Sequence, residues 1–171
     1  MKRLRAQVDR IIGWLLVILM GGAVLNVLWQ VFTRWALQDP SSYTEELARY
    51  LLIWIGLLGA AYAVGQKMHL AIDILPQALK GAKRRALEIT IHGVVIAFSS
   101  AVMIVGGLRL VWLTLRFDQV SAALGIPLGY VYSVLPLSGL LMVFYAICEM
   151  SDGSSLQATG IADADRKVDG V

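Results

Sequence analysis

The sequence is poor in the residues that catalysis and metal binding require. Its 171 residues include a single cysteine, Cys148, and two histidines, His69 and His92. One cysteine excludes an internal disulfide, and no ligand set for a structural metal is evident. The chain also lacks the P-loop, HExxH, GxSxG and CxxC motifs. These absences argue against an enzyme and predict a protein that binds neither a metal nor a cofactor.

Charge is scarce as well, and it is unevenly placed. Charged residues make up 16% of the chain and hydrophobic residues 58%, above the ~45–50% apolar content of soluble domains. The apolar residues concentrate in four runs, each near the ~20 residues that cross a bilayer as a helix. The basic residues lie at the ends of these runs, which argues against nucleic-acid binding. We therefore predict an all-α membrane protein with four transmembrane helices in a lipid bilayer.

The predicted spans cover residues 11–33, 44–65, 88–111 and 128–148. Residues 1–10 precede them as a basic segment, and the polar residues 149–171 predict a disordered tail. The third helical pattern extends from Ala82 to Leu115, roughly 50 Å at the helical rise, so we expect a long, tilted helix. Pro136 lies inside the fourth span and predicts a kink there.

The lysines and arginines predict the orientation. The N-terminal segment has four of them, and the second loop has five. The first and third loops, with the adjacent helix ends, have four: Arg34, Arg49, Arg109 and Arg116. Because cytoplasmic loops carry the excess of basic residues, both termini are expected in the cytoplasm.

The second span has the most distinctive ends and faces. Ser42 and Glu45 fit a capping box that starts the helix near Ser42. Glu45 and Arg49, four residues apart, predict a local ion pair; the functional alternative is contact with a partner protein at the membrane edge. One helical face carries small residues that would let another helix come close. They are Gly56, Gly59, Ala60 and Ala63.

The first span carries polar residues at intervals of four. Gly22, Asn26, Gln30 and Arg34 form one stripe. We favour hydrogen bonds between helices of the bundle as its role. The alternative is a substrate or ion path, because polar groups inside membranes are often functional. No ionised group lies at mid-depth of the stripe, which weakens that alternative.

A set of ordered motifs resembles a known family. The second span has Glu45-Glu46-x-x-Arg49, and Pro136 follows Gly125-Ile126-Pro127 by nine residues. With the other matching positions, these motifs occur in the same order as in a known family, and the resemblance covers residues 10–148. The chain resembles the small, DctQ-type membrane subunit of tripartite ATP-independent periplasmic (TRAP) transporters. The matching residues with an implied role in packing or partner contact are Glu45, Glu46, Arg49, Trp54, Gly59, His69, Asp73, Pro127 and Pro136.

The resemblance implies a division of labour among three proteins. A large multi-span membrane subunit would carry the substrate and sodium sites, and a periplasmic substrate-binding protein would deliver an organic acid. This chain would then brace the large subunit in the bacterial inner membrane, as a multi-pass protein that makes no contact with the transported ligand. The substrate cannot be read from this chain, because its determinants are expected in the other subunits.

Two alternatives stay open at this stage. The small four-span subunit of a tripartite tricarboxylate transporter shares the size and polarity of this chain, but not the Glu-Glu-x-x-Arg and His-Asp pattern. A membrane redox enzyme would need a haem between His69 and His92 at compatible depths on facing helices. His69 lies beyond its span and His92 inside another, so the haem reading is the weaker one.

Overall fold

The computed structural model describes residues 2–38, 42–66 and 82–149, and they are helical except for a loop at 117–127 and the short ends of the described segments. This confirms the all-α prediction. The helices are α1 (Lys2–Phe32), α2 (Ser42–Gly65), α4 (Ala82–Phe98), α5 (Gly107–Arg116) and α6 (Leu128–Tyr132). Two stretches are π-helical: η1 (Thr33–Leu37), which continues α1, and η2 (Ser99–Gly106), which joins α4 to α5. After α6, residues 134–149 are helical again.

Four helical segments are long and apolar enough to cross a membrane, as predicted. They are Arg3–Leu37, Ser42–Gly65, Ile89–Arg116 and Leu128–Glu149. The second begins at Ser42, where the capping pattern placed its start. The first reaches further toward the N-terminus than the predicted 11–33, because the basic segment is itself helical from Lys2. The predicted disordered tail, apart from Glu149, lies outside the described residues.

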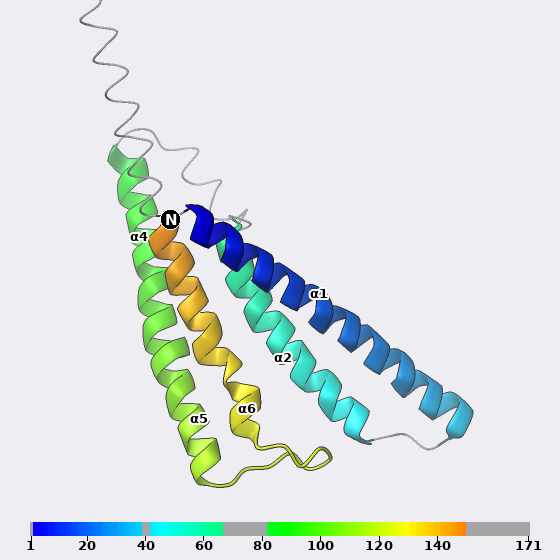
Figure 1. Ribbon diagram of the computed structural model, residues 1–171. Helices are drawn as coiled ribbons and strands as arrows, with labels where there is room; N and C mark the ends of the chain where they lie inside the picture. Colours follow the sequence, from blue (N-terminus) through cyan, green and yellow to red (C-terminus); the bar gives the residue numbers. More distant parts are fainter. Residues whose placement is uncertain (1, 39–41, 67–81, 150–171) are drawn as a thin grey trace, which may run out of the picture.

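The spans pack as two pairs, α1 with α2 and α5 with α6. In Figure 1 the helices converge near the N-terminus, and α1 diverges from the α4–α5 segment toward the opposite end. The two pairs are joined by Trp54 of α2, which bonds Val131, and near the N-terminus by Asp9 of α1, which bonds Tyr145.

The α1–α2 seam follows from a repeat in the sequence of α1. Its more buried positions recur at alternating intervals of four and three, the pattern of helices packed along a left-handed seam. They are Ile12, Leu16, Leu19, Ala23, Asn26, Gln30 and Thr33. Asn26 donates from Nδ2 to the Thr44 carbonyl of α2 at 2.8 Å. Of the predicted polar stripe, Asn26 and Gln30 lie on this seam, whereas Gly22 and Arg34 are exposed.

Two glycines allow the third and fourth spans to pack closely against each other. A Cβ on Gly107 would lie 2.9 Å from Cδ of Pro136, and one on Gly139 would lie 2.8 Å from Cβ of Met103. Neither position can hold a larger residue without movement. Ser99, at the start of η2, is fully buried beside this contact. The close contact between the third and fourth spans thus depends on glycine at these two positions.

The last span is interrupted one turn before Pro136. α6 ends at Tyr132, and Ser133 donates its backbone N–H to the Gly129 carbonyl at 3.1 Å. Proline has no N–H to donate to the carbonyl four residues earlier, which is that of Tyr132. The helical bonding therefore changes where the sequence placed a kink; the kink itself stays a prediction.

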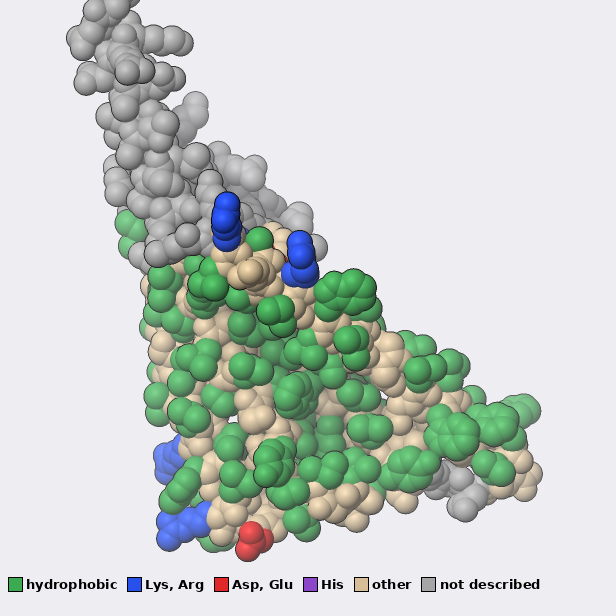
Figure 2. All heavy atoms as spheres, viewed as in Figure 1, with side chains coloured by type: hydrophobic (Ala, Val, Ile, Leu, Met, Phe, Trp, Pro, Cys, Tyr) green, Lys and Arg blue, Asp and Glu red, His purple; other side chains and the backbone are tan. Residues whose placement is uncertain are grey.

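The outer surface is largely apolar. Figure 2 shows one face nearly covered by hydrophobic side chains, with Lys and Arg side chains at its two ends. The large exposed hydrophobic residues include Trp14, Leu25 and Phe32 on α1, and Val105 on η2. Apolar surface of this extent is normal for a protein whose solvent is lipid.

Candidate functional site

The carboxylate of Glu46 joins α2 to the loop between α5 and α6. It accepts hydrogen bonds from the backbone N–H groups of Ala123 at 2.8 Å and Leu124 at 3.2 Å. The Tyr50 hydroxyl, one turn further along α2, donates to the same carboxylate at 2.6 Å. We call Glu46, Tyr50, Ala123 and Leu124 the loop clamp. Hydrogen bonds to an ionised acceptor are the stronger kind, so this clamp orders the loop against α2.

The loop is also ordered by its own backbone. Ser121 donates its N–H to the Ile126 carbonyl at 2.9 Å and accepts from the Gly125 N–H at 3.0 Å. Gly125 takes φ +63°, a left-handed conformation that favours glycine. Pro127 is the N-cap residue of α6. The Gly125-Ile126-Pro127 motif therefore ends a tight turn and starts the last span.

The predicted Glu45–Arg49 ion pair forms on the exposed side of α2, near its N-terminal end. Arg49 Nη2 lies 3.7 Å from Glu45 Oε1, and the two side chains are 68% and 71% exposed. Beside them is a hollow of about 250 Å³ lined by Ser42, Glu45, Glu46, Arg49, Ala122 and Ala123. The neighbouring glutamates thus have different roles: Glu46 holds the loop, and Glu45 faces outward.

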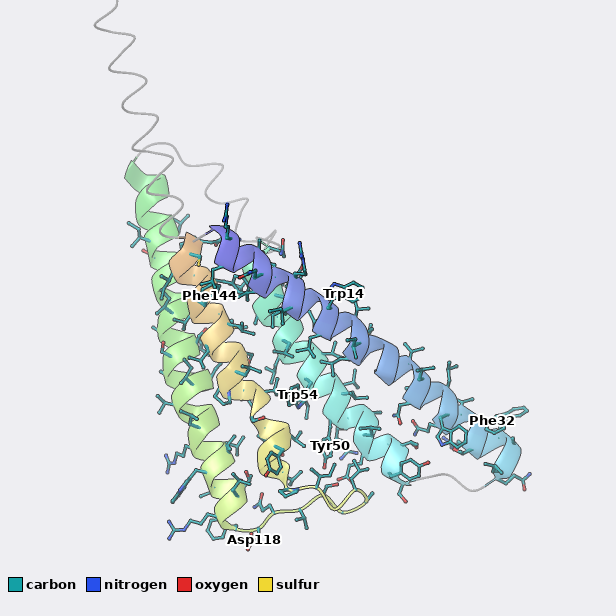
Figure 3. All side chains as sticks on the ribbon, viewed as in Figure 1. Trp14, Phe32, Tyr50, Trp54, Asp118 and Phe144 are labelled. Atoms are coloured by element: carbon teal, nitrogen blue, oxygen red, sulfur yellow. The ribbon has the colours of Figure 1, made fainter. Side chains whose placement is uncertain are left out.

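Trp54 and Gly59 occupy different sides of α2. Trp54 donates from Nε1 to the Val131 carbonyl of α6 at 3.1 Å, which ties the two pairs of helices together. Tyr50 and Trp54 both lie on the side of α2 that faces α6 (Figure 3). A Cβ added at Gly59 or at Gly56 would meet nothing within 4 Å. The two glycines of the predicted small-residue face therefore meet no other helix of the described chain at their Cβ positions.

A second polar group lies at the opposite end of α2. Arg5 donates from Nη2 to the Gly65 carbonyl, the last residue of α2, and lies 3.8 Å from the Glu149 carboxylate. His92 Nε2 lies 3.9 Å from the other Glu149 oxygen. The Tyr145 hydroxyl donates to Asp9 at 2.7 Å. We call this group the Glu149 cluster; it draws side chains or backbone from all four spans.

The sequence reasoning missed most of this cluster. The sequence places His92 inside a span without predicting its contact with Glu149, and Asp9, Tyr145 and Glu149 are not among the predicted site residues. Arg5 was counted only for orientation. Their positions at the ends of apolar runs were the available signal, because charged residues there often pair. His69 and Asp73 lie outside the described residues, and within the described ranges no group of His, Cys, Asp and Glu could hold a metal ion.

Together the two groups fix α2 at both ends. The loop clamp ties the start of α2 to the α5–α6 loop, and the Glu149 cluster ties its last residue to α1 and to the last span. Trp54 adds a link between them. The arrangement ties the four spans to one another and leaves an apolar outer surface.

Comparison with known proteins gives consistent matches. Residues 23–155 match the family described as tripartite ATP-independent periplasmic transporters, DctQ component. The chain is 31% identical over 144 residues to the sialic acid TRAP transporter small permease protein SiaQ of Vibrio cholerae, covering 84% of this chain and 82% of that protein. It is 28% identical to the ectoine TRAP transporter small permease protein TeaB of Halomonas elongata, covering 91% and 84%.

A third match is to a much longer protein. The sialic acid TRAP transporter permease protein SiaT of Haemophilus influenzae is 28% identical over 119 residues, which cover 67% of this chain but 18% of SiaT. In that relative, a segment similar to this chain is therefore part of one long permease polypeptide.

Proposed function

The chain belongs to the DctQ component family of tripartite ATP-independent periplasmic transporters, and we propose that it braces the large membrane subunit of such a transporter. Its relatives are transporter subunits and not enzymes. The family match also separates it from the tricarboxylate-transporter and haem alternatives.

One observation carries the bracing role: α2 is fixed at both ends to the other spans. Hydrogen bonds between helices contribute to helix association inside a membrane. Arg5 of α1 donates to the Gly65 carbonyl at one end of α2, and the Glu46 carboxylate near the other end accepts from the 117–127 loop. A subunit whose helices are held in fixed positions can resist the movement of a partner. A subunit that moves during transport needs flexible connections between its helices.

The partner would be the large multi-span permease subunit. The long SiaT relative supports this, because joining the two parts in one chain keeps them together. We further propose that a periplasmic binding protein delivers the substrate, an organic acid, and that sodium drives its uptake. The apolar spans would lie in the bacterial inner membrane, with both termini in the cytoplasm and the 117–127 loop in the periplasm.

Reconstitution tests this proposal. Proteoliposomes would contain the large subunit, with the binding protein and labelled substrate outside, and either include or omit this chain. We expect sodium-dependent uptake only when the chain is present, and none from the chain alone. Full uptake without the chain, or uptake by the chain by itself, contradicts the scaffold assignment.

A further inference from the structure

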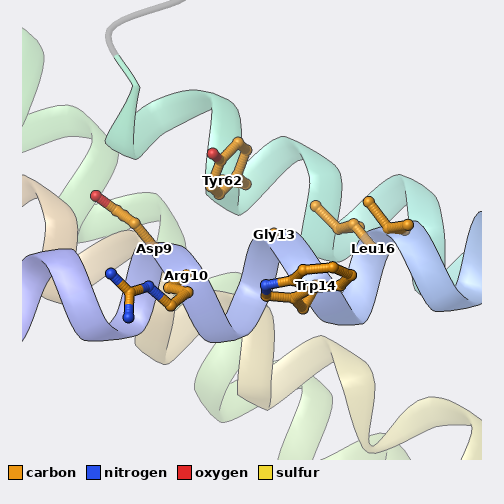
Figure 4. Close-up of a pocket in the computed structure, with 7 residues that line it drawn as sticks. Asp9, Arg10, Gly13, Trp14, Leu16 and Tyr62 are labelled. Atoms are coloured by element: carbon orange, nitrogen blue, oxygen red, sulfur yellow. The ribbon is translucent and has the colours of Figure 1, made fainter.

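A hollow on the outer side of the α1–α2 pair is separate from the loop clamp. It has a volume of about 600 Å³ and is lined by Asp9, Arg10, Gly13, Trp14, Leu16 and Tyr62, among others. Figure 4 shows Asp9 and Arg10 toward one end, Trp14 and Leu16 toward the other, and Tyr62 reaching from α2. The hollow is therefore polar at one end and mainly apolar at the other.

The position of Arg10 sets the depth of this hollow in a membrane. Arg10 is the last charged residue before the uncharged run at 11–33, so it marks the boundary between the headgroups and the hydrocarbon. Leu16 follows six residues later, roughly 9 Å along the helix. Trp14 is 64% exposed between them, where an amphipathic ring suits the interface. The polar end thus lies at headgroup depth, and the apolar end among the acyl chains.

The two charges at the polar end point to a particular headgroup. Arg10 is exposed, and among the described residues none forms an ion pair with it. A guanidinium binds phosphate oxygens well. Asp9 accepts from Tyr145 through Oδ1, and a carboxylate has further acceptor sites for an ammonium. A headgroup with only negative charge would be repelled by Asp9, whereas one with both phosphate and ammonium matches both side chains.

We propose that this hollow is a binding site for one phospholipid with a phosphate and a primary ammonium in its headgroup, of the phosphatidylethanolamine type. Arg10 binds the phosphate, Asp9 accepts from the ammonium, and one acyl chain lies along Gly13 and Leu16 beside Trp14. Gly13 leaves room for that chain, since even an added Cβ would meet only the Tyr62 hydroxyl, at 3.9 Å. The site does not depend on the proposed bracing role.

Native mass spectrometry of the delipidated full-length chain tests the site. Phosphatidylethanolamine, phosphatidylglycerol and phosphatidylcholine are titrated separately. We expect one saturable phosphatidylethanolamine per chain and weaker binding of the other two. Arg10→Gln should weaken that binding about tenfold, the size of one lost charge-assisted bond. The matched control is Arg3→Gln, which removes an exposed cation two turns earlier on α1 and should change binding by less than about twofold.

Asp9→Asn tests the ammonium contact and keeps an acceptor for Tyr145. It should weaken phosphatidylethanolamine binding and leave phosphatidylglycerol unchanged or tighter. Equal binding of all three lipids, or equal effects of the Arg3 and Arg10 substitutions, overturns the proposal. A photo-crosslinker at Val17, which also lines the hollow, identifies the occupant in cells. A crosslinked phospholipid supports the site; a crosslink to a second copy or to the large subunit overturns it.

Discussion

Glu46 accepts a hydrogen bond from the Ala123 backbone N–H at 2.8 Å, although 77 residues separate them in the sequence. Glu46 lies in the second turn of α2, and Ala123 lies in the loop between the third and fourth spans. The bond therefore connects the two helix pairs at the end where α1 and α5 diverge (Figure 1). Its loss should loosen the loop before it affects the spans.

Glu46→Gln should release this loop while keeping the helices. A neutral amide is a weaker acceptor than a carboxylate, so the amides of Ala123 and Leu124 should exchange with solvent several-fold faster. Hydrogen exchange of the detergent-solubilised protein, followed by mass spectrometry of peptides from 117–127, measures this. Glu45→Gln is the control: its exposed pair with Arg49 contributes little, and loop exchange should stay unchanged. Equal exchange in both variants would show that the loop is held by its own turn.

Glu45 and Glu46 show which side-chain contacts can be predicted from the sequence and which cannot. The family resemblance implies a role in packing or partner contact for both glutamates, and the i, i+4 spacing predicts the pairing of Glu45 with Arg49. Nothing in the local pattern distinguished the glutamate that binds a distant loop. That distinction depends on where Ala123 comes to lie, which is decided by packing between spans and not by periodicity.

Gly107→Ala should destabilise the protein, because its Cβ would lie 2.9 Å from Cδ and 3.0 Å from the backbone nitrogen of Pro136. Overpacking of this kind costs about 1–3 kcal/mol. Unfolding in mixed micelles with increasing denaturing detergent measures the change. Gly56→Ala adds the same methyl group where nothing lies within 4 Å, so its stability should be unchanged or slightly higher. Wild-type stability in the Gly107 variant would argue that the third and fourth spans are further apart.

Arg5 and Glu149 should be energetically coupled. The cost of stranding a fully buried ion partner is about 3–5 kcal/mol, but these side chains are 20% and 11% exposed, so we expect a coupling energy nearer ~1 kcal/mol. The measurement is a double-mutant cycle of Arg5→Gln and Glu149→Gln in the same unfolding assay. Arg3→Gln with Glu149→Gln provides the uncoupled control. Additive effects of Arg5→Gln and Glu149→Gln would show that each side chain acts through other contacts.

The Glu149 cluster marks the limit of prediction from sequence. Hydropathy located four spans, since burial in lipid requires about 20 apolar residues whatever the tertiary contacts. Charged residues at the ends of apolar runs indicate that such pairs can form. The cluster unites residues from both ends of the described chain, however, and no local pattern shows which of them meet. The π-helical stretch Ser99–Gly106 was also missed, because a change from α- to π-helical hydrogen bonding leaves the apolar composition unchanged.

Fusion reporters should place both termini on one side of the membrane. The excess of basic residues in the N-terminal segment and the second loop predicts a cytoplasmic location for both ends. A fluorescent protein at the C-terminus should fluoresce, and alkaline phosphatase there should be inactive. The same phosphatase inserted in residues 117–127 should be active. Phosphatase activity at the C-terminus would contradict the predicted orientation or an even number of spans.

The final prediction concerns Gly59, on the small-residue face of α2. In the described chain, a Cβ added at Gly59 would have no other atom within 4 Å. If this face contacts the large subunit, Gly59→Leu should reduce co-purification of that subunit about tenfold, because a bulky side chain prevents close backbone approach. The isolated chain should keep its stability, since no neighbouring atom lies within 4 Å of the new Cβ. The matched control is Gly93→Leu on α4, which is equally open and should leave co-purification unchanged. Wild-type co-purification in the Gly59 variant would instead place this face against lipid, while a loss in both variants would point to a defect common to any enlarged outer surface.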